Sequence, residues 1–502
     1  FLYDENDAVP DDAEAGCDWD GLAVEIPFTV ESGSEASDLP VGRVTSDPAG
    51  EEADELSVTL DAADFAWIRT ELEVTDGDLV VFGASDIQRV VAAEPGSVVP
   101  QQTVPGSGNV SPVLSRPAIS AAGFVAWEAF DSNGTDDPAD DDLDILVSNG
   151  VETLNISDGI DEDDGRVDGS PRISGIRVVW ESAEPGDEST SEIYHADLSG
   201  FPDGPVTPVR ITTNDIADFD ARVSGPFVVW VGADESGDSD IFYVNLDETP
   251  CDPTPCDPPA IDDPLDVSEG SPWISGSRVV WQRAEPSEGE PAGEGADFEI
   301  FYADLADPIV TPHALTANAY PDVRPYIADE RVVWEGFVPD LLPSFADDSE
   351  VFFADLRVDP IVPLRLTDND AFETNIRARG SVPQDLRVGV FWEVLTAGGR
   401  SAITIDAANV DPDGVPLEVP QILSTGPVGQ GSLQVSDDLV LWTQLVDDEP
   451  ENEQDPDPLE NLEIFSSPPI AVPEPGPVAL RAAVLVALAL LAPTRRGRAQ
   501  RR

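Results

Sequence analysis

A short apolar stretch that ends in an aromatic residue recurs along the chain at intervals of about 50 residues. Its clearest form is Arg177-Val-Val-Trp180, and looser copies follow the same pattern. The other copies end at Phe82, Trp127, Trp230, Trp281, Trp334, Trp392 and Trp442. A fixed period of this length indicates stacked supersecondary units, each of which buries its apolar surface only against its neighbours. The 502-residue chain can therefore form one large repeat body instead of several separate domains.

Each repeat predicts four short β-strands. In the repeat around Trp180 we expect strands at 171–174, 177–181, 192–198 and 209–212, because these segments are rich in β-branched and aromatic residues between Gly, Pro, Asp or Asn. The apolar run Val178–Trp180 has no polar alternation, which indicates a strand covered on both faces. Serial four-stranded sheets of this size are the blades of a propeller.

The sequence therefore predicts an all-β fold: a single β-propeller of eight four-stranded blades, with seven as the alternative. Eight counts the abbreviated first repeat at Leu79-Val-Val-Phe82, and seven leaves it out. The last repeat, ending at Phe465, has no obvious fourth strand, which an N-terminal segment could supply to close the ring. We expect residues 1–70 to be a partly ordered acidic extension, 71–469 the propeller, and 470–502 a separate tail that contains a short apolar helix.

The repeats resemble those of TolB-type, WD40-like propellers. The resemblance rests on a first strand that ends Ile173-Ser-Gly175, the Val-Val-Trp second strand, a third strand such as Glu299-Ile-Phe-Tyr-Ala-Asp-Leu305, and Leu315-Thr-Ala-Asn318. In that family the first turn is usually Ser-Pro-Asp-Gly, and here it is shortened to Ser-Gly. No Gly-x-Ser-x-Gly elbow is present, so the hydrolase joined to some such propellers is not predicted.

The C-terminal tail carries three features in a fixed order. Pro473, Glu474 and Pro475 precede an apolar stretch, residues 478–493, and then come Arg495 and Arg496. The apolar stretch is shorter than the roughly 20 residues of a spanning helix. The tail resembles a PEP-CTERM sorting signal, which implies a processing enzyme of the exosortase type. An ordinary C-terminal membrane anchor is the alternative, and both place the propeller outside the cytoplasmic membrane.

The amino-acid composition excludes nucleic acid as a partner. With 101 acidic and 25 basic residues, the net charge is −76, so the chain lacks the clustered cations that bind nucleic acid. Such charge suits a salty medium, where repulsion is screened.

Cys251 and Cys256, close together in a Pro-rich loop, predict a disulfide in an oxidising compartment. Zinc binding is the weaker alternative, because Cys17 and two isolated histidines make a poor ligand set.

No catalytic constellation stands out, but one set of residues is a candidate binding site. The two histidines, His195 and His313, lie in different repeats and build no acid–base pair. Tryptophans at the second-strand position suit packing between blades. Trp273 differs, because it lies in a first strand, as do Arg172, Arg222 and Tyr326 at related positions. The first strand is innermost in a propeller, so these four residues are candidates to line a channel or bind a ligand; packing in the core is the alternative.

The loops after the second strands are strongly acidic, and alternating strand direction places them on one face. Two of them offer oxygen ligands for calcium: Asp131, Asn133 and Asp136 in one loop, and Asp234, Asp238 and Asp240 in the other. Neither matches the EF-hand pattern, and solvated surface loops are the alternative. An acidic residue also precedes the third strand in seven repeats, among them Asp144, Glu192, Glu299 and Glu350.

These features together predict a non-enzymatic, exported protein at the cell surface or in the medium. We expect it to bind envelope polysaccharide or another extracellular partner, with transient membrane attachment through the tail and calcium as the one candidate cofactor. Two alternatives remain open: a carbohydrate-active lyase or glycosidase on the same scaffold, and a structural spacer of a surface layer.

Overall fold

The computed structural model describes the β-rich body of the chain. The residues described are 42–43, 53–62, 64–75, 79–90, 102–108, 110, 115–131, 142–157, 166–184, 187–214, 216–233, 239–248, 256, 258, 260–261, 267–285, 297–338, 349–369, 371–379, 388–395, 403–410, 421–424, 428, 432–436, 439–446 and 461–467. Over these residues the fold is all β, apart from one 3-10 turn, η1 (Leu198–Gly200). The same residues include no helix long and apolar enough to cross a membrane.

The strands pair in sequence order into antiparallel sheets. The first sheet contains β2 (Ala53–Asp61), β3 (Asp64–Thr75), β4 (Leu79–Val90) and β5 (Gln102–Thr103). The next contains β6 (Ala118–Ile119), β7 (Val125–Asp131), β8 (Asp142–Ser148), β9 (Thr153–Asn155), β10 (Val167–Ser174), β11 (Arg177–Glu184), β12 (Asp187–Asp197) and β13 (Val209–Arg210). This sheet is two repeats joined by one parallel pairing, Val167 with Leu143.

The second half of the chain continues the pattern. Its sheets contain β14 (Ala217–Ser224), β15 (Phe227–Ala233) and β16 (Ser239–Asn245); β17 (Glu269–Ser275), β18 (Arg278–Glu285), β19 (Asp297–Asp304) and β20 (His313–Ala314); β21 (Asp322–Ala328), β22 (Arg331–Gly336), β23 (Glu350–Asp355) and β24 (Leu364–Arg365); and β25 (Phe372–Ala378), β26 (Val388–Leu395), β27 (Ile403–Val410) and β28 (Gln421–Ile422). The last sheet contains β29 (Gln434–Val435), β30 (Val440–Val446), β31 (Asn461–Ser467) and β1 (Gly42–Arg43).

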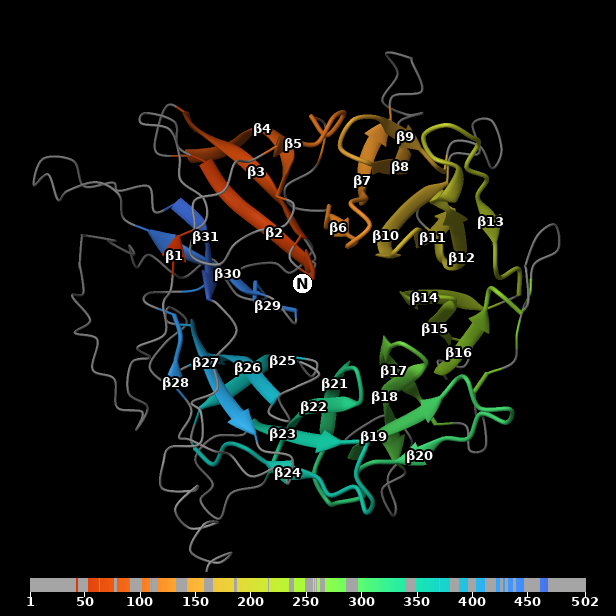
Figure 1. Cartoon of the computed structure of the whole chain (residues 1–502), viewed down its shortest axis with the longest axis vertical. Coiled ribbons are helices and arrows are strands. Elements are labelled where there is room, and N and C mark those ends of the chain that lie inside the picture. Colours follow the sequence, from red (N-terminus) through yellow and green to blue (C-terminus); the bar gives the residue numbers. More distant parts are fainter. Residues whose placement is uncertain are drawn as a thin grey trace, which may run out of the picture.

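The sheets are arranged in a ring, which makes the fold propeller-like (Figure 1). The first strand of each repeat lies toward the centre and the last toward the rim (Figure 1). Each first strand contacts the preceding repeat, and β2 in turn contacts β29, β30 and β31. The ring is completed by β1, which pairs with β31 through Gly42–Ser466 and Arg43–Phe465. An N-terminal segment therefore supplies the strand that the last repeat lacks.

The Val-Val-Trp motif forms the second strand and packs on both faces, as its apolar run predicts. Val178 and Trp180 lie in an apolar cluster with Ile145 and Val147 of the preceding repeat. Val179 faces the other way, into a cluster with Trp230 of the following repeat. Fully burying such side chains stabilises a fold by roughly 1.5–3 kcal/mol each. The repeats therefore hold together mainly through these shared apolar layers.

The hairpin between first and second strands explains the Ser-Gly turn. Gly175, Gly225 and Gly276 have φ of 58°, 56° and 59°, in the left-handed region where a residue without Cβ is unstrained. In the hairpin between β21 and β22, Asp329 takes the same place with φ of 54°. The turn is short because a left-handed residue at this point reverses the chain directly into the second strand.

The first repeat differs from its predicted form. We expected Leu79–Phe82 to be its second strand, but these residues begin β4, which is the third strand. The second strand is β3, and Trp67 in Phe65-Ala-Trp67 is the fully buried counterpart of Trp127. The β3–β4 hairpin continues to Thr75 and Leu79, so Leu-Val-Val-Phe is an extension of that hairpin. The sheet begins at Ala53, so the segment predicted as an extension contains β1, β2 and part of β3.

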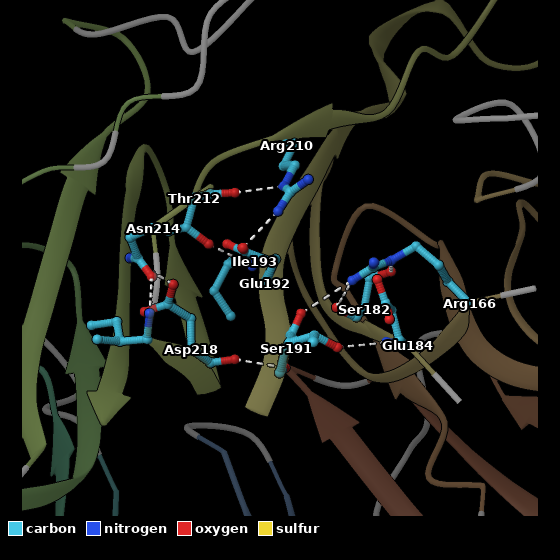
Figure 2. Close-up of polar contacts among 12 residues, drawn as sticks. Arg166, Ser182, Glu184, Ser191, Glu192, Ile193, Arg210, Thr212, Asn214 and Asp218 are labelled. Carbon is cyan, nitrogen blue, oxygen red and sulfur yellow. Dashed lines mark hydrogen bonds and ion pairs between the residues drawn. The ribbon is translucent and has the colours of Figure 1, made fainter. Parts of the chain in front are cut away.

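Polar side chains connect neighbouring repeats, as Figure 2 shows for the residues around Thr212 and Asn214. Thr212 accepts the backbone N–H of Ile193 at 2.9 Å, and Asn214 donates to Asp218 at 2.9 Å. The residues of the Leu-Thr-x-Asn motif therefore tie the third strand of one repeat to the first strand of the next. Thr316–Asn318 and Thr367–Asn369 make the same bonds.

The acidic residue before the third strand belongs to the same network. Glu192 is buried and accepts from Arg210, as Figure 2 shows. Asp144 accepts from Asn155 and Ser157, Glu299 from the N–H of Asn318, and Glu350 from the N–H of Asn369. These four carboxylates are therefore structural acceptors inside the sheets, and the pattern seen in the sequence marks a fold constraint rather than an exposed cation-binding surface.

Candidate functional site

The first strands contain a β-bulge, a shift in strand register that changes the direction of the neighbouring side chain. Between Phe219 and Arg222, for example, the register with β15 shifts, and Asp220 has a φ of 53°. The same shift, with a left-handed residue, occurs at Ser57, Ser170, Ser271, Arg324 and Asn375. A left-handed non-glycine residue costs on the order of 1 kcal/mol or more, so a structural partner is expected to hold it.

A side chain from the preceding repeat supplies that partner. Glu181, directly after Trp180, accepts the N–H of Asp220 at 2.8 Å. Gln282, directly after Trp281, accepts the N–H of Arg324 at 2.9 Å. Glu128 likewise accepts the N–H of Ser170. The residue after the tryptophan therefore fixes the bulge of the next first strand.

We call the position two residues after each left-handed bulge residue the inner position. It is defined by pairing with the residue before the second-strand tryptophan, as Arg222 pairs with Val229. In chain order the inner positions are Thr59, Ala118, Arg172, Arg222, Trp273, Tyr326, Arg377 and Gln434. The backbone is repeated, but the side chains change from small and neutral to aromatic and cationic.

A central cavity of ≈ 330 Å³ opens beside four consecutive first strands, β14, β17, β21 and β25. Its wall includes the inner-position residues Arg222, Trp273, Tyr326 and Arg377. The bulge residues Asp220, Ser271, Arg324 and Asn375 line it as well. This volume lies within the range of small-molecule sites, and its lining mixes aromatic, cationic, acidic and neutral polar groups.

The aromatic residues of the cavity hold the arginines in place. The rings of Trp273 and Tyr326 lie 4.9 Å apart at 46°. The Arg222 guanidinium lies 4.8 Å from the Trp273 ring centre, and that of Arg377 lies 5.4 Å from Trp273 and 5.0 Å from Tyr326. Guanidinium groups stack on aromatic faces by cation–π attraction, and stacking leaves the N–H donors at their edges available.

The carboxylates of the cavity are already bound by the protein. Asp220 forms an ion pair with Arg222 at 2.8 Å. Glu335 accepts from Thr374 at 3.0 Å and pairs with Arg324 at 3.2 Å. Glu393 accepts from Asn375 at 2.8 Å and from the N–H of Leu433 at 3.2 Å. Burial raises the pKa of the Glu335 carboxyl, and Arg324 and Thr374 offset part of that effect.

The arginines around the cavity repel one another. Burial, and then repulsion by Arg222, lower the pKa of Arg172 to about 10. Burial also lowers the pKa of Arg377, and Arg222 adds to the effect. Arg222 therefore repels the guanidinium groups of two other repeats, although the chain as a whole carries a charge of −76. The cavity wall contains three arginines, Arg222, Arg324 and Arg377, beside the three carboxylates of Asp220, Glu335 and Glu393.

The structure brings three of the four predicted channel residues to one cavity. Arg222, Trp273 and Tyr326 line it, and Arg172 holds the inner position of the neighbouring β10. The sequence missed Arg377, because the other four lie eight residues before their tryptophans, whereas a longer connection separates Arg377 from Trp392. Arg324 was also missed, since nothing in the sequence marked the bulge position as facing the centre.

The other predicted sites fall largely outside the described residues. Of the calcium candidates, Asp131 ends β7 and Asp240 lies in β16, while Asn133, Asp136, Asp234 and Asp238 lie outside. Within the described ranges, no group of three or more His, Cys, Asp or Glu residues could hold a metal ion. Cys256 is disulfide-bonded, and both Cys251 and Cys17 lie outside. So do Pro473, Glu474, Pro475, Arg495, Arg496 and the predicted tail helix.

The sequence matches no protein-family model and no curated protein. Solved structures give fold-level matches of low identity. A prolyl endopeptidase matches with a TM-score of 0.45 and 11% identity, over 79% of this chain and 52% of that one. A Pyrococcus horikoshii acylaminoacyl peptidase matches with a TM-score of 0.42 and 10% identity, over 78% and 57%. A Pseudomonas brassicacearum lignostilbene dioxygenase matches with a TM-score of 0.37 and 12% identity, over 78% and 93%. The chain thus spans little more than half the length of these peptidases.

Proposed function

We propose that the protein is an exported, eight-bladed propeller that binds an extracellular carbohydrate, in the first place envelope polysaccharide, at its central cavity. The blade count rests on eight fully buried tryptophans, one on each second strand: Trp67, Trp127, Trp180, Trp230, Trp281, Trp334, Trp392 and Trp442. The observation that carries binding is the cavity, where a repeated backbone presents side chains of different chemistry to one space. Functional variation on a rigid scaffold is typical of recognition sites.

The ion-paired carboxylates favour binding over catalysis. Glycoside hydrolysis needs two carboxyl groups, one to protonate the leaving oxygen and one to act as base or nucleophile. Here Asp220, Glu335 and Glu393 already take part in ion pairs or hydrogen bonds with other side chains of the protein. Burial raises the pKa of the Glu335 carboxyl, which is the direction that a general acid requires, so Glu335 is the residue to test for the enzyme alternative.

Export is the second part of the proposal, and it rests on the tail sequence. Pro473–Pro475, the apolar stretch and Arg495–Arg496 occur in the order of a PEP-CTERM signal. An exosortase-type enzyme would then process the tail after it holds the chain transiently at the membrane. Removal of residues 470–502 is expected to release folded protein into the medium of a producing bacterium. Retention of the truncated protein in the membrane fraction would contradict this part of the proposal.

Binding and catalysis can be separated in one experiment. The full chain is screened against extracellular polysaccharides and their oligomers for binding by calorimetry and for new reducing or unsaturated ends. We expect saturable binding without chain cleavage, and loss of that binding in Trp273→Ala. The control is Arg177→Gln, which removes a surface ion pair with Asp247 and does not touch the cavity. Cleavage that Glu335→Gln abolishes would replace the binding function with the enzyme alternative.

A further inference from the structure

The guanidinium groups of Arg222 and Arg377 both stack on the same indole. Arg222 is 4.8 Å and Arg377 is 5.4 Å from the Trp273 ring centre. Because these contacts occupy the aromatic surface of Trp273, a ligand in the cavity meets the edges of the guanidinium groups. Those edges carry N–H donors, five per arginine, and no acceptors.

Few of these donors are used within the protein. Arg222 uses one terminal nitrogen for Asp220, and its buried Nε has no hydrogen-bond partner among the described residues. Arg377 donates from one terminal nitrogen to the carbonyl of Ile376 at 3.0 Å. A buried donor without an acceptor is unfavourable, because its hydration is lost and not replaced, so a ligand that supplies acceptors would recover that free energy.

Charge points to the same kind of ligand. Arg222 repels both Arg172 and Arg377, and burial disfavours the charged form of those two arginines. The three cavity carboxylates are already engaged, Asp220 with Arg222, Glu335 with Arg324 and Glu393 with Asn375. An anionic group placed among the guanidinium edges would relieve the repulsion and form charge-assisted, bidentate hydrogen bonds.

We infer that the cavity recognises an anionic saccharide through an oxyanion group, a carboxylate or a sulfate, held by Arg222 and Arg377. This inference rests on the proposed carbohydrate-binding function and names the class of sugar. The neutral wall of the cavity suits the remainder of such a ligand, because Ser271 and Asn375 bring a hydroxyl and an amide to the space beside the arginines. Neutral polar groups of this kind pair with sugar hydroxyls, while the arginines select for charge.

Matched ligand pairs test the inference on the full chain by titration calorimetry. One pair is an oligomer of galacturonate, glucuronate or mannuronate and its methyl ester, in which a small methyl group removes the charge of each carboxyl group. The other pair is a sulfated oligosaccharide and its desulfated form. We expect one acidic member to bind at least about 10-fold more tightly than its neutral counterpart, since hydrogen bonds to charged groups exceed neutral ones by that order.

The variants assign the effect to the arginines. Arg222→Gln and Arg377→Gln are each expected to weaken binding of the acidic ligand about 10-fold or more and to leave binding of the neutral counterpart nearly unchanged. Arg177→Gln, the surface control, should bind both ligands as the wild type does. Thermal melting of each variant verifies folding, and the ratio of acidic to neutral affinity is measured within one variant, so a partly destabilised variant still gives an answer.

Each outcome decides between the two proposals. Equal affinity for acidic and neutral members of both pairs overturns the anionic-ligand inference and leaves the carbohydrate-binding function in place. Failure of every oligosaccharide to bind, acidic or neutral, overturns both. Discrimination in the uronate pair alone assigns the carboxylate as the recognised group, and discrimination in the sulfated pair alone assigns the sulfate.

Discussion

Two sectors of the ring share one backbone pattern and differ in the side chains that they place at the inner positions. The cavity sector is defined as three of the four repeats that line the cavity, those that begin at β14, β17 and β21, with the inner positions Arg222, Trp273 and Tyr326. The fourth, which begins at β25, is left out of the comparison because the indole nitrogen of its Trp392 has no hydrogen-bond partner among the described residues. In the opposite sector, the repeats that begin at β2 and β6, the inner positions are Thr59 and Ala118. Figure 1 shows the same succession of strands in both. The side chains at the inner position are therefore free to vary without loss of the strand pairing.

The buried tryptophans of the two sectors differ in whether their indole N–H donates a hydrogen bond to a carboxylate. Trp230, Trp281 and Trp334 donate their indole N–H at 2.9 Å to Asp218, Glu269 and Asp322. In the opposite sector, the indole nitrogens of Trp67 and Trp127 have no hydrogen-bond partner among the described residues. Apolar packing of the tryptophan is thus enough to form a repeat, and the carboxylate is an additional feature. The predictions below separate these contributions.

The largest effect is expected from removing a packed tryptophan. Trp281→Ala should lower the free energy of unfolding by about 3–5 kcal/mol, because the fully buried ring leaves a cavity between two sheets. Trp273→Ala removes the same side chain from an inner position and should cost about 1 kcal/mol, a typical value for a half-buried residue. Chemical denaturation measures both. Equal losses of unfolding free energy in the two variants would show that Trp273 packs in the core as Trp281 does, and would contradict its separate role in the cavity.

The second prediction concerns the buried carboxylates of the cavity sector. Burial raises the pKa of Asp218, Glu269 and Asp322 to about 7 each, and their hydrogen bonds offset only part of this. A group with a raised pKa stabilises the fold fully below its unfolded pKa and loses that contribution as pH rises through the folded value. The free energy of unfolding that these three carboxyl groups contribute should therefore fall as the pH rises from about 4.5 to about 7.

Glu269→Gln isolates one of them, since an amide stays neutral at every pH. Between pH 5 and pH 8 the stability of this variant should improve by about 2 kcal/mol relative to the wild type. Unfolding free energies at both pH values give the double difference, and the exposed Asp203→Asn is the control. A difference between variant and wild type that does not change with pH would mean that Glu269 is ionised throughout, and would remove the electrostatic contrast between the sectors.

The third prediction tests how repeats position one another's bulges. Glu181→Ala leaves the N–H of Asp220 without its acceptor and should cost about 1–3 kcal/mol. Glu181→Gln should cost less, because Gln282 makes the equivalent bond to the N–H of Arg324 in another part of the ring. Denaturation of the two variants decides the matter. If alanine is tolerated as well as glutamine, the left-handed bulge does not depend on this contact.

The sequence predicted the repeat because packing of Val-Val-Trp between sheets imposes the same pattern each time. The strand order, the two-sided burial of Val178–Trp180 and the missing last strand follow from that pattern. The first repeat was misassigned because the β3–β4 hairpin runs on into a second apolar stretch, Leu79–Phe82, which imitates the motif. The site was predicted only in part, because the spacing to the tryptophan finds Arg222 but misses Arg377, and a bulge has no residue signature of its own.

The smallest effect on stability is expected at the inner position itself. Arg222→Gln removes a cation–π contact with Trp273, worth about 0.5–1 kcal/mol, and the ion pair with Asp220. It also removes the repulsion that Arg222 exerts on Arg172 and Arg377, which acts in the opposite direction. The unfolding free energy should therefore change by less than about 1 kcal/mol. Thr59→Ala at the equivalent position of the opposite sector is the matched control and should also be nearly neutral. A loss of several kcal/mol in Arg222→Gln alone would mean that the arginine is retained for stability, and the argument that the cavity sector is specialised for a ligand would lose its basis.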